Sequence, residues 1–261
     1  MYYKKSLGQN FLTDKNIIKK IVSLTAIKGK DIIEIGPGSG ALTKEILNQK
    51  PKSLSLIEKD KNLTDELMRK FIKEKNLKIF NNDILEFNLE NIVKKKTIIF
   101  GNLPYNISSQ ILIKILRFKK WPPNISDLIF MFQKELGEKI IGKFSSSNYG
   151  RLSIITNLRL KIKDKFFVSK NCFFPKPKVT SMVLHFQPKL NNTYKIKKVS
   201  NLEKVTNIIF SNKRKMINKS LKKILNSNEI NKIFDLKVNS RPSELKPDIY
   251  YKITELFESK N

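Results

Sequence analysis

The chain has 261 residues, 40% of them hydrophobic and 29% charged, which allows one large domain and one small one. Its single cysteine, Cys172, excludes an intrachain disulfide, and the lack of a signal core or an apolar run of about 20 residues favours a cytoplasmic protein. The formal charge of +29 favours a polyanionic partner, although 46 of the 52 basic residues are lysines, which also fits a coding bias toward lysine.

Five short apolar runs in the first half of the chain are typical of buried strands, and amphipathic segments separate them. These runs are Asp31–Ile35, Ser53–Ile57, Leu77–Phe80, Thr97–Phe100 and Asp127–Phe132. Strands that alternate with helices form parallel sheets covered on both faces, so the pattern predicts an α/β domain. Thr13 and Asp14 are suited to cap a helix that precedes the first of these strands.

The pattern changes after residue 160. Lys161–Val168 and Val179–Phe186 are strand-like runs without a helix between them, which predicts an antiparallel edge to the sheet. A polar stretch with a proline follows, and it predicts a boundary between a domain at residues 1–187 and a small domain at residues 188–261.

The small domain contains only helical patterns. Ser200-Asn-Leu-Glu203 has the form of a capping box and predicts a helix start, with apolar positions at helical spacing as far as Ile224. Pro247 suits the first turn of a final helix. The domain is only slightly richer in positive charge than the rest of the chain, so charge alone does not assign the contacts with a polyanion to it.

Three glycines, Gly36, Gly38 and Gly40, lie between the first predicted strand and a helix, where glycine permits a sharp turn close to a ligand. Glu58 and Asp83 follow the next two strands, at the same edge of a parallel sheet. The two carboxylates are suited to a ribose and an adenine amine, so the pattern predicts an adenosine-containing cofactor. A nicotinamide dinucleotide and a tight turn without a ligand remain open, and the third glycine comes one position early for the dinucleotide fingerprint.

The fourth strand runs into Gly101-Asn-Leu-Pro-Tyr105. The amide oxygen of Asn102 and the carbonyl of Leu103 are suited to accept both hydrogens of an exocyclic amine. Pro104 has no N–H to compete for them, and Tyr105 offers a ring for stacking. The segment predicts chemistry on the amino group of adenine and shifts the expected cofactor to S-adenosylmethionine.

In such a reaction the protein aligns an adenine N6 with an already activated methyl group. Acceptors for both N6 hydrogens free the nitrogen lone pair and stabilise the positive charge that develops during the transfer. Because an amide is a weak base, we expect the proton to leave after methyl transfer. No cluster of cysteine and histidine residues indicates a metal, and the single histidine, His185, is expected to be structural.

Six segments together resemble the ribosomal RNA adenine N6,N6-dimethyltransferases, in the order and spacing of that family. They are Gly8-Gln-Asn-Phe-Leu12, Glu34-Ile-Gly-Pro-Gly38, Gly101-Asn-Leu-Pro-Tyr-Asn-Ile-Ser108, Gln133-Lys-Glu135, Tyr149-Gly-Arg-Leu-Ser153 and Phe173-Phe-Pro-Lys-Pro-Lys-Val-Thr-Ser181. The resemblance implies a Rossmann-like S-adenosylmethionine-dependent methyltransferase domain, with a mostly parallel sheet, followed by a small all-helical C-terminal domain.

The resemblance also implies roles for individual residues. It implies that Asn10 and Leu12 contact the methionine part of S-adenosylmethionine, and that Gly36 and Gly38 form its binding turn. It implies that Glu58 binds the ribose, Asp83 the adenine, and Asn102 both the cofactor and the target amine. The flipped target adenine is then expected between Tyr105 and Phe173, although strand periodicity leaves open whether Phe173 or Phe174 is buried. The Pro175-x-Pro177 that follows fixes an extended loop, which favours an exposed position at the rim of the site for Phe173 over a core position.

The segment Phe210–Leu221 is similar to a small-domain helix of the bacterial small-subunit enzymes, the kasugamycin-sensitivity branch of the family. That branch implies two adjacent adenosines near the 3′ end of 16S rRNA, each methylated twice, and a role in small-subunit assembly. Phosphate contacts are then expected from Lys213, Arg214, Lys215 and Lys219, with a solvated helix face as the alternative.

Three other functions remain open. They are a large-subunit dimethyltransferase of the macrolide-resistance type, a non-catalytic RNA-binding assembly factor and, most distantly, a dehydrogenase. Phe210–Leu221 favours the small-subunit enzyme over the first. The intact Asn102-Leu-Pro-Tyr105 and Glu58 argue against the second. We expect the protein to act as a monomer on ribosomal RNA, away from membranes.

Overall fold

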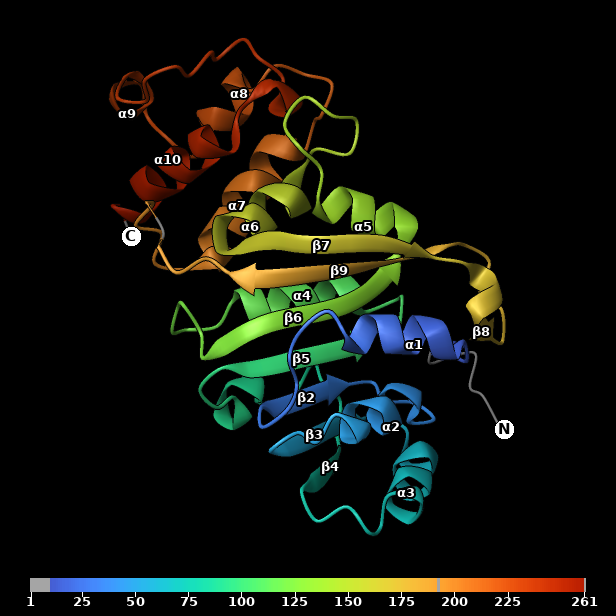
Figure 1. Cartoon of the computed structure of the whole chain (residues 1–261). Helices are drawn as coiled ribbons and strands as arrows, with labels where there is room; N and C mark the ends of the chain where they lie inside the picture. Colours follow the sequence, from blue (N-terminus) through green and yellow to red (C-terminus); the bar gives the residue numbers. More distant parts are fainter. Residues whose placement is uncertain (1–9, 192, 261) are drawn as a thin grey trace. The chain divides into compact units, whose positions relative to one another are not determined.

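A computed structural model describes residues 10–191 and 193–260 of the chain (Figure 1). Gly8 and Gln9 of the first motif lie outside the described residues. In chain order the α-helices and β-strands are β1 (Phe11–Leu12), α1 (Lys15–Val22), β2 (Asp31–Ile35), α2 (Ala41–Asn48), β3 (Ser53–Glu58), α3 (Lys61–Lys70), β4 (Leu77–Asn81), β5 (Thr97–Asn102), α4 (Ser108–Leu116), β6 (Ile125–Gln133), α5 (Lys134–Ile140), α6 (Arg151–Arg159), β7 (Leu160–Val168), β8 (Phe173–Phe174), β9 (Ser181–Pro188), α7 (Val199–Phe210), α8 (Asn218–Leu221), α9 (Ser227–Asn231) and α10 (Pro247–Glu258).

One sheet carries the fold of the first part of the chain. Its seven strands lie in the order β4-β3-β2-β5-β6-β9-β7. The strands from β4 to β6 in this order are parallel, and β9 runs antiparallel to β6. The mostly parallel sheet with an antiparallel edge is therefore confirmed. The chain order reverses at β2, which places a ligand crevice at the carboxyl ends of β2 and β5.

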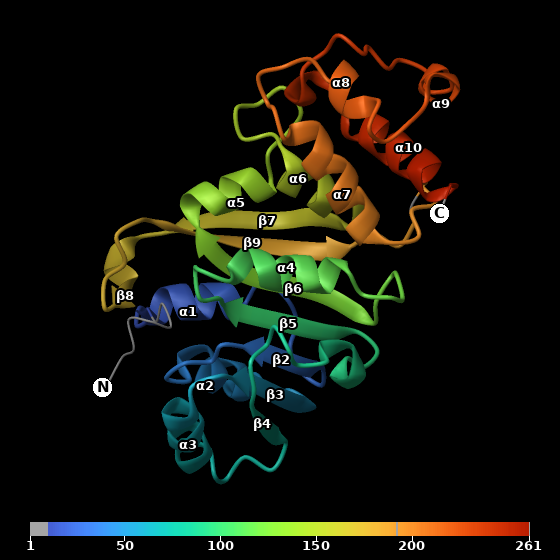
Figure 2. The same ribbon diagram turned by 180° about the vertical axis from the view of Figure 1, so that it is seen from behind.

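Alternate residues of the central strands face opposite sides of the sheet, and both sides are apolar. On one side, Ile32 and Ile98 join a core cluster with side chains of α1, α2 and α3. Figure 1 shows α1 and α2 on this side, and Figure 2, from behind, shows α4 on the other. Asp14 caps α1 as predicted, because its Oδ1 accepts the backbone N–H groups of Asn16 and Ile17 at 2.9 and 3.0 Å.

The described residues form two compact units. The first contains the chain up to Lys114, Pro122–Gly137 and Lys161–Pro188, and the second contains Ile115–Trp121, Glu138–Leu160 and the chain from Lys189. The second unit thus includes α6, whose buried Ile154 and Leu158 lie on a helix that packs with α7. The division into functional domains at residues 1–187 and 188–261 stays a prediction. No helix in residues 10–191 and 193–260 is long and apolar enough to span a membrane.

Two expectations for the helices of the second unit are wrong. The helix α7 begins at Val199 with Lys198 as its N-cap, and Ser200 does not form the predicted capping box. Glu203 instead forms a two-point ion pair with Arg117, at 2.7 Å for each hydrogen bond. The Glu258 carboxylate at the end of α10 accepts the backbone N–H groups of Lys197 and Lys198, the two residues that precede α7, and so fixes the chain where the helix begins.

The predicted long helix also ends early. Helix α7 stops at Phe210. In the stretch predicted to continue it, turns at residues 211–216 are followed by the short helix α8. All six of these residues are exposed, so a helix there has no apolar face to bury. The backbone N–H of Ile217 donates to the carbonyl of Ser240 rather than continuing the helix. Pro247 occupies the first turn of α10, as predicted.

Candidate active site

A cavity of about 260 Å³ lies at the carboxyl ends of the parallel strands, within the first unit. It brings together ten of the predicted site residues. They are Asn10, Leu12, Gly36, Gly38, Glu58, Asp83, Asn102, Leu103, Pro104 and Tyr105. These residues lie at the ends of β2, β3 and β5, in the loop after β4, and in or next to the short N-terminal strand β1. The cavity is therefore built where the sequence predicted a ligand.

The glycine turn after β2 has the left-handed backbone that only glycine adopts at little cost. Gly38 has φ +57°, and a Cβ at this position would come within 3.0 Å of the Phe11 ring. The Gly38 N–H also donates to Oε2 of Glu58 at 3.2 Å. The turn therefore combines close approach of the backbone with a fixed carboxylate at the cavity wall.

Glu58 ends β3 and is 8% exposed. Burial raises the pKa of its carboxyl, and hydrogen bonds from the backbone N–H groups of Asp60 and Gly38 oppose the shift without cancelling it. The bond from Asp60 to Oε1 is 2.9 Å long. Each oxygen thus holds one backbone donor, and its remaining lone pairs are suited to the two hydroxyls of a ribose.

Glu34 is a carboxylate of the cavity wall whose role the sequence did not predict. It is 1% exposed and accepts a hydrogen bond of 2.6 Å from the Thr43 hydroxyl. Burial raises the pKa of Glu34 to about 7, and the nearby charge of Glu58 adds to the shift against the opposing effect of Thr43. The sequence feature that could have identified Glu34 as a site residue is its place in the Glu34-Ile-Gly-Pro-Gly38 segment. The side chain holds α2 against β2 beside the glycine turn.

Asp83 lies in the loop that follows β4. Its Oδ2 pairs with the ammonium of Lys59 at 2.7 Å, and its Oδ1 accepts the backbone N–H of Leu85 at 2.9 Å. The hydrogen bond from Lys59 lowers the pKa of the carboxyl against the effect of burial. Asp83 is therefore an ionised acceptor at the cavity edge, which suits an adenine amine.

The Asn102–Tyr105 corner lies against the glycine turn. A Cβ on Gly36 would be 3.7 Å from both the Asn102 carbonyl and the Pro104 ring. The Asn102 amide nitrogen donates to the carbonyl of Asn10 at 3.1 Å. This bond uses the donor side of the amide and leaves its oxygen to accept from a substrate.

Gly101 makes the corner compact. A Cβ here would come within 2.5 Å of the Leu103 side chain and 3.1 Å of Phe130. Leu103 is consequently 1% exposed, although its backbone borders the cavity. Strand β5 continues through Asn102, two residues beyond the predicted end.

Tyr105 has a partner that the sequence did not reveal. Its hydroxyl lies 2.7 Å from Oγ of Ser181, the fully buried first residue of β9. Burial raises the pKa of Tyr105, and the Ser181 hydrogen bond opposes the shift. The hydroxyl is thus held as a neutral group, and its bond fixes the position of the outer end of the ring.

Phe173 is not at the cavity wall. It is 5% exposed, pairs with Leu12 through β1 and β8, and belongs to the core cluster. Phe174, 56% exposed, is the ring that reaches the surface. The expectation that the following prolines favour an exposed Phe173 is wrong, because pairing with β1 turns alternate residues inward. Stacking of Phe173 on a target base stays a prediction.

The predicted RNA-binding residues of the second unit are all exposed. Lys213, Arg214 and Lys215 lie in the turns between α7 and α8, and Lys219 lies in α8. They do not share one helix face, because the predicted long helix is interrupted. Their contact with RNA stays a prediction.

The fold and the cavity define a methyltransferase that uses S-adenosylmethionine. The family model for ribosomal RNA adenine dimethylase matches residues 2–259. The chain belongs to this family and is an rRNA adenine dimethyltransferase with S-adenosylmethionine as its methyl donor.

Individual relatives agree with this assignment. The chain is 45% identical to ribosomal RNA small subunit methyltransferase A of Pelagibacter ubique, over 98% of this chain and 97% of the relative. It is 37% identical to the protein of the same name from Malacoplasma penetrans, over 97% and 91%. A dimethyladenosine transferase from Plasmodium falciparum has a similar structure, with a TM-score of 0.75, 25% identity and coverage of 96% and 98%. The 23S rRNA methyltransferase ErmE shares the fold, with a TM-score of 0.70, 21% identity and coverage of 95% and 99%.

Proposed function

We propose that this protein methylates N6 of two adjacent adenosines near the 3′ end of small-subunit rRNA, twice each, to N6,N6-dimethyladenosine. We further propose that it acts as a cytoplasmic monomer and contributes to small-subunit assembly. Relatives at 37–45% identity over nearly the whole chain are named small subunit methyltransferases, which supports this substrate. The likeness to ErmE concerns the fold alone, so a large-subunit substrate has less support.

The orientation of the Asn102 amide carries the proposal. Because its nitrogen donates to the Asn10 carbonyl at 3.1 Å, its oxygen is the part that accepts a hydrogen from adenine N6. The Leu103 carbonyl accepts the other hydrogen, and Pro104 offers no N–H in competition. Two acceptors draw the amine toward tetrahedral geometry and favour the positive charge of the transition state.

The cavity fits the methyl donor. Glu58 is suited to the ribose, Asp83 to the adenine amine, and the Gly38 turn to close contact by the backbone. When bound, S-adenosylmethionine supplies a methyl group activated by a sulfonium. Asn10 and Leu12 border the same cavity, and we propose that they contact the methionine part.

Tyr105 holds the base once it leaves the RNA stack. Its ring borders the cavity, and its hydroxyl is fixed by Ser181. We expect the proton to leave N6 after methyl transfer, because Asn102 and Leu103 offer only neutral oxygens. A monomethylated amine keeps one hydrogen, so one acceptor is unused in the second round.

Transfer of label from radioactive S-adenosylmethionine tests the proposal. Undermethylated small subunits are expected to gain about four methyl groups each, two on each of two flipped adenosines. Undermethylated large-subunit RNA, assayed in parallel, is expected to gain none. Label in the large-subunit RNA instead would contradict the substrate, and tight RNA binding without label in either would indicate an assembly factor.

The Asn102→Ala variant tests the mechanism. Loss of the acceptor is expected to lower kcat about 100-fold or more, in the range known for removal of one group that stabilises transition-state charge. Asn106→Ala is the matched control, because Asn106 also borders the cavity but lies outside the proposed pair of acceptors. A higher KM for RNA with unchanged kcat would show that Asn102 only binds the substrate.

A further inference from the structure

The outer strand β7 presents a row of basic side chains that ends in an exposed aromatic ring. Residues two apart in a strand share one face, so Lys161, Lys163, Lys165 and Phe167 point to the same side at intervals of about 7 Å. All four are exposed, and 55% of the Phe167 surface is accessible. Strand β7 is the last strand of the sheet on this side, so the row borders an edge (Figure 1).

On the opposite face of β7, packing explains the residues next to Phe167, whereas Ile162 and Asp164 further back are exposed. Phe166 packs against the core cluster and has the Lys20 ammonium 4.2 Å from its ring centre, and Val168 is fully buried. These contacts account for the apolar residues at positions 166 and 168. They give no reason for a phenylalanine at the outward position 167, where burial contributes little.

The contacts of Lys134 place Phe167 at the active-site end of the sheet. The ammonium of Lys134 lies 5.4 Å from the centre of the Phe167 ring. The backbone N–H of Lys134 donates to the carbonyl of Thr180 at 2.9 Å, and the preceding Gln133 pairs with Ser181. Ser181 in turn holds the Tyr105 hydroxyl at the cavity. The pairing of β6 with β9 thus places the Lys134–Phe167 pair close to Tyr105, the predicted base-stacking residue.

We propose that Lys134, Lys163, Lys165 and Phe167 bind the single-stranded RNA that flanks the target adenosine. A flanking base stacks on the exposed part of the Phe167 ring, and the ammonium groups meet successive phosphates. This gives the Gln133-Lys-Glu135 segment a role in substrate binding through Lys134. The inference rests on the proposed RNA methyltransferase function and names the part of the first unit that holds the RNA.

Charge favours RNA over other occupants of this edge. The outward row carries three lysines, with Asp164 on the other face as the acidic residue of the strand. Lysines on an outer strand also discourage pairing with another sheet. That role explains the lysines of β7, but it explains neither an exposed Phe167 nor the cation above its ring. A protein strand added to β7 is the competing occupant, and the test below separates the two.

Charge reversal of the row is the first arm of the test. The double variant Lys163→Glu with Lys165→Glu is compared with Lys73→Glu and Lys75→Glu, two exposed lysines between α3 and β4 that change the net charge equally. The probe is a deproteinised RNA hairpin with two adjacent adenosines in its loop and single-stranded extensions, followed by fluorescence anisotropy. We expect about tenfold weaker RNA binding for the first variant and a log–log salt dependence shallower by about 0.7 per lysine.

The aromatic ring is the second arm. Phe167→Ala is expected to raise the KM for RNA about tenfold without a change in kcat or in S-adenosylmethionine affinity, and Phe167→Trp is expected to restore binding. A 2-aminopurine beside the target adenosines reports stacking through quenching, which the alanine variant is expected to lose. A merely structural role for Phe167 would not produce this recovery by tryptophan.

The outcomes distinguish this inference from the proposed function. Equal RNA binding by the charge-reversal and control variants, with unchanged quenching in Phe167→Ala, would overturn the proposal that this surface binds RNA. Weaker binding to protein-containing subunits, with unchanged binding to the bare hairpin, would assign the edge to a protein and would also overturn it. Absence of methyl transfer by the wild-type chain, with RNA binding that still depends on these residues, would instead contradict only the proposed function.

Discussion

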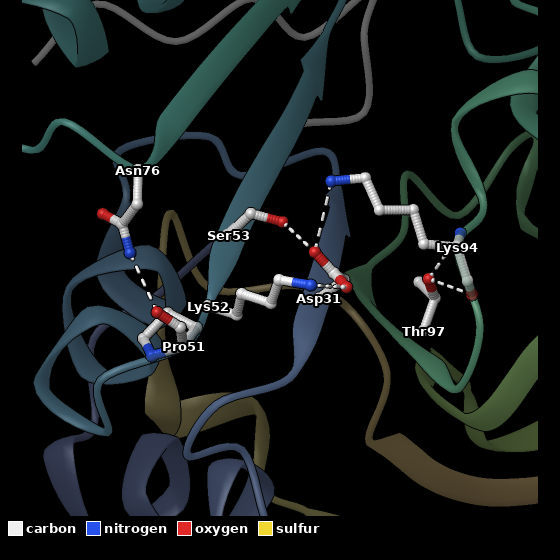
Figure 3. A network of polar contacts seen from close by, with 7 residues as sticks. All are labelled: Asp31, Pro51, Lys52, Ser53, Asn76, Lys94 and Thr97. Atoms are coloured by element: carbon white, nitrogen blue, oxygen red, sulfur yellow. Dashed lines mark hydrogen bonds and ion pairs between the residues drawn. The ribbon is translucent and has the colours of Figure 1, made fainter.

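The carboxylates of β2 and β3 at the two ends of the parallel sheet have pKa values that are shifted in opposite directions. At the amino end, Asp31 begins β2, and its Oδ1 accepts hydrogen bonds from the Ser53 hydroxyl at 2.5 Å and the Lys94 ammonium at 3.3 Å. Lys52 lies 3.8 Å from the other oxygen (Figure 3). Burial raises the pKa of Asp31, but the Ser53 and Lys94 hydrogen bonds and the two charges outweigh it and lower the pKa overall.

The network around Asp31 is completed by contacts that tie loops together. The Thr97 hydroxyl accepts from the backbone N–H of Lys94 and donates to its carbonyl, at 2.9 and 2.7 Å. The Asn76 amide donates to the Pro51 carbonyl at 2.9 Å (Figure 3). These groups are satisfied by the protein itself, so this end of the sheet contributes to stability.

At the carboxyl end, three residues further along β2, Glu34 lies beside Glu58, and both have raised pKa values because of burial. Two nearby buried carboxylates cost folding free energy at neutral pH. A protein retains such a pair where a ligand uses it, as at many active sites. The comparison indicates that one end of the sheet is built for stability and the other for S-adenosylmethionine.

The largest expected effect concerns the pH dependence of stability at Glu34. Its folded pKa of about 7 lies above the unfolded value of 4.5, so the folded state binds the proton more tightly. The stabilisation is complete below about pH 4.5 and is lost as the pH rises toward 7, by about 3 kcal/mol. Glu34→Gln is expected to remove this loss, as measured by the free energy of unfolding in urea at pH 5 and 8.

The control for Glu34 is Glu66→Gln, which replaces an exposed glutamate of α3. It is expected to leave the wild-type dependence on pH in place. If Glu34→Gln and wild type lose the same free energy of unfolding between pH 5 and 8, Glu34 is not the cause.

The next largest effect compares one carboxylate from each end of the sheet, Glu58 and Asp31. Glu58→Gln is expected to weaken S-adenosylmethionine binding about 10- to 100-fold, because ribose hydroxyls lose a charged acceptor, and to leave stability unchanged or higher. Asp31→Asn is expected to leave that affinity unchanged and to lower the free energy of unfolding by about 1 kcal/mol. Calorimetric titration and urea unfolding of both variants give the four values. Equal affinity loss in the two variants would contradict the division between ligand binding and stability.

The sequence predicted what local chemistry determines. Apolar runs identified the parallel strands, and the residues that follow them, such as Glu58 and Asp83, necessarily meet at one edge. Asp14 was recognisable as a cap, and the Asn102 corner as an acceptor pair, because each depends on neighbouring residues.

The features that the sequence did not reveal depend on distant residues. Ser181 meets Tyr105 across 76 positions, and although it ends the Phe173–Ser181 segment, no local pattern reveals this contact. Pairing of β8 with β1 decides that Phe173 rather than Phe174 is buried. The residues before α7, Lys197 and Lys198, are held by Glu258, about 60 positions further along the chain, and Glu203 pairs with Arg117 instead of forming the capping box expected at Ser200.

The smallest effect concerns the hydrogen bond by which β9 positions the end of the Tyr105 ring. Ser181→Ala and Tyr105→Phe each remove one hydroxyl from the same hydrogen bond, whose length is 2.7 Å. Each is expected to lower kcat/KM for RNA about fivefold, the equivalent of about 1 kcal/mol for one hydrogen bond. Because both changes break one interaction, the double variant is expected to be no slower than either single variant.

Ser53→Ala is the matched serine control at the amino end of the sheet, because it removes the hydrogen bond to Asp31. It is expected to lower the free energy of unfolding and to leave kcat/KM unchanged. Additive losses in the Tyr105 and Ser181 double variant would mean that the two hydroxyls act independently. In that case the ring of Tyr105 is oriented by its packing in the Asn102–Tyr105 corner, and β9 has no part in positioning the base.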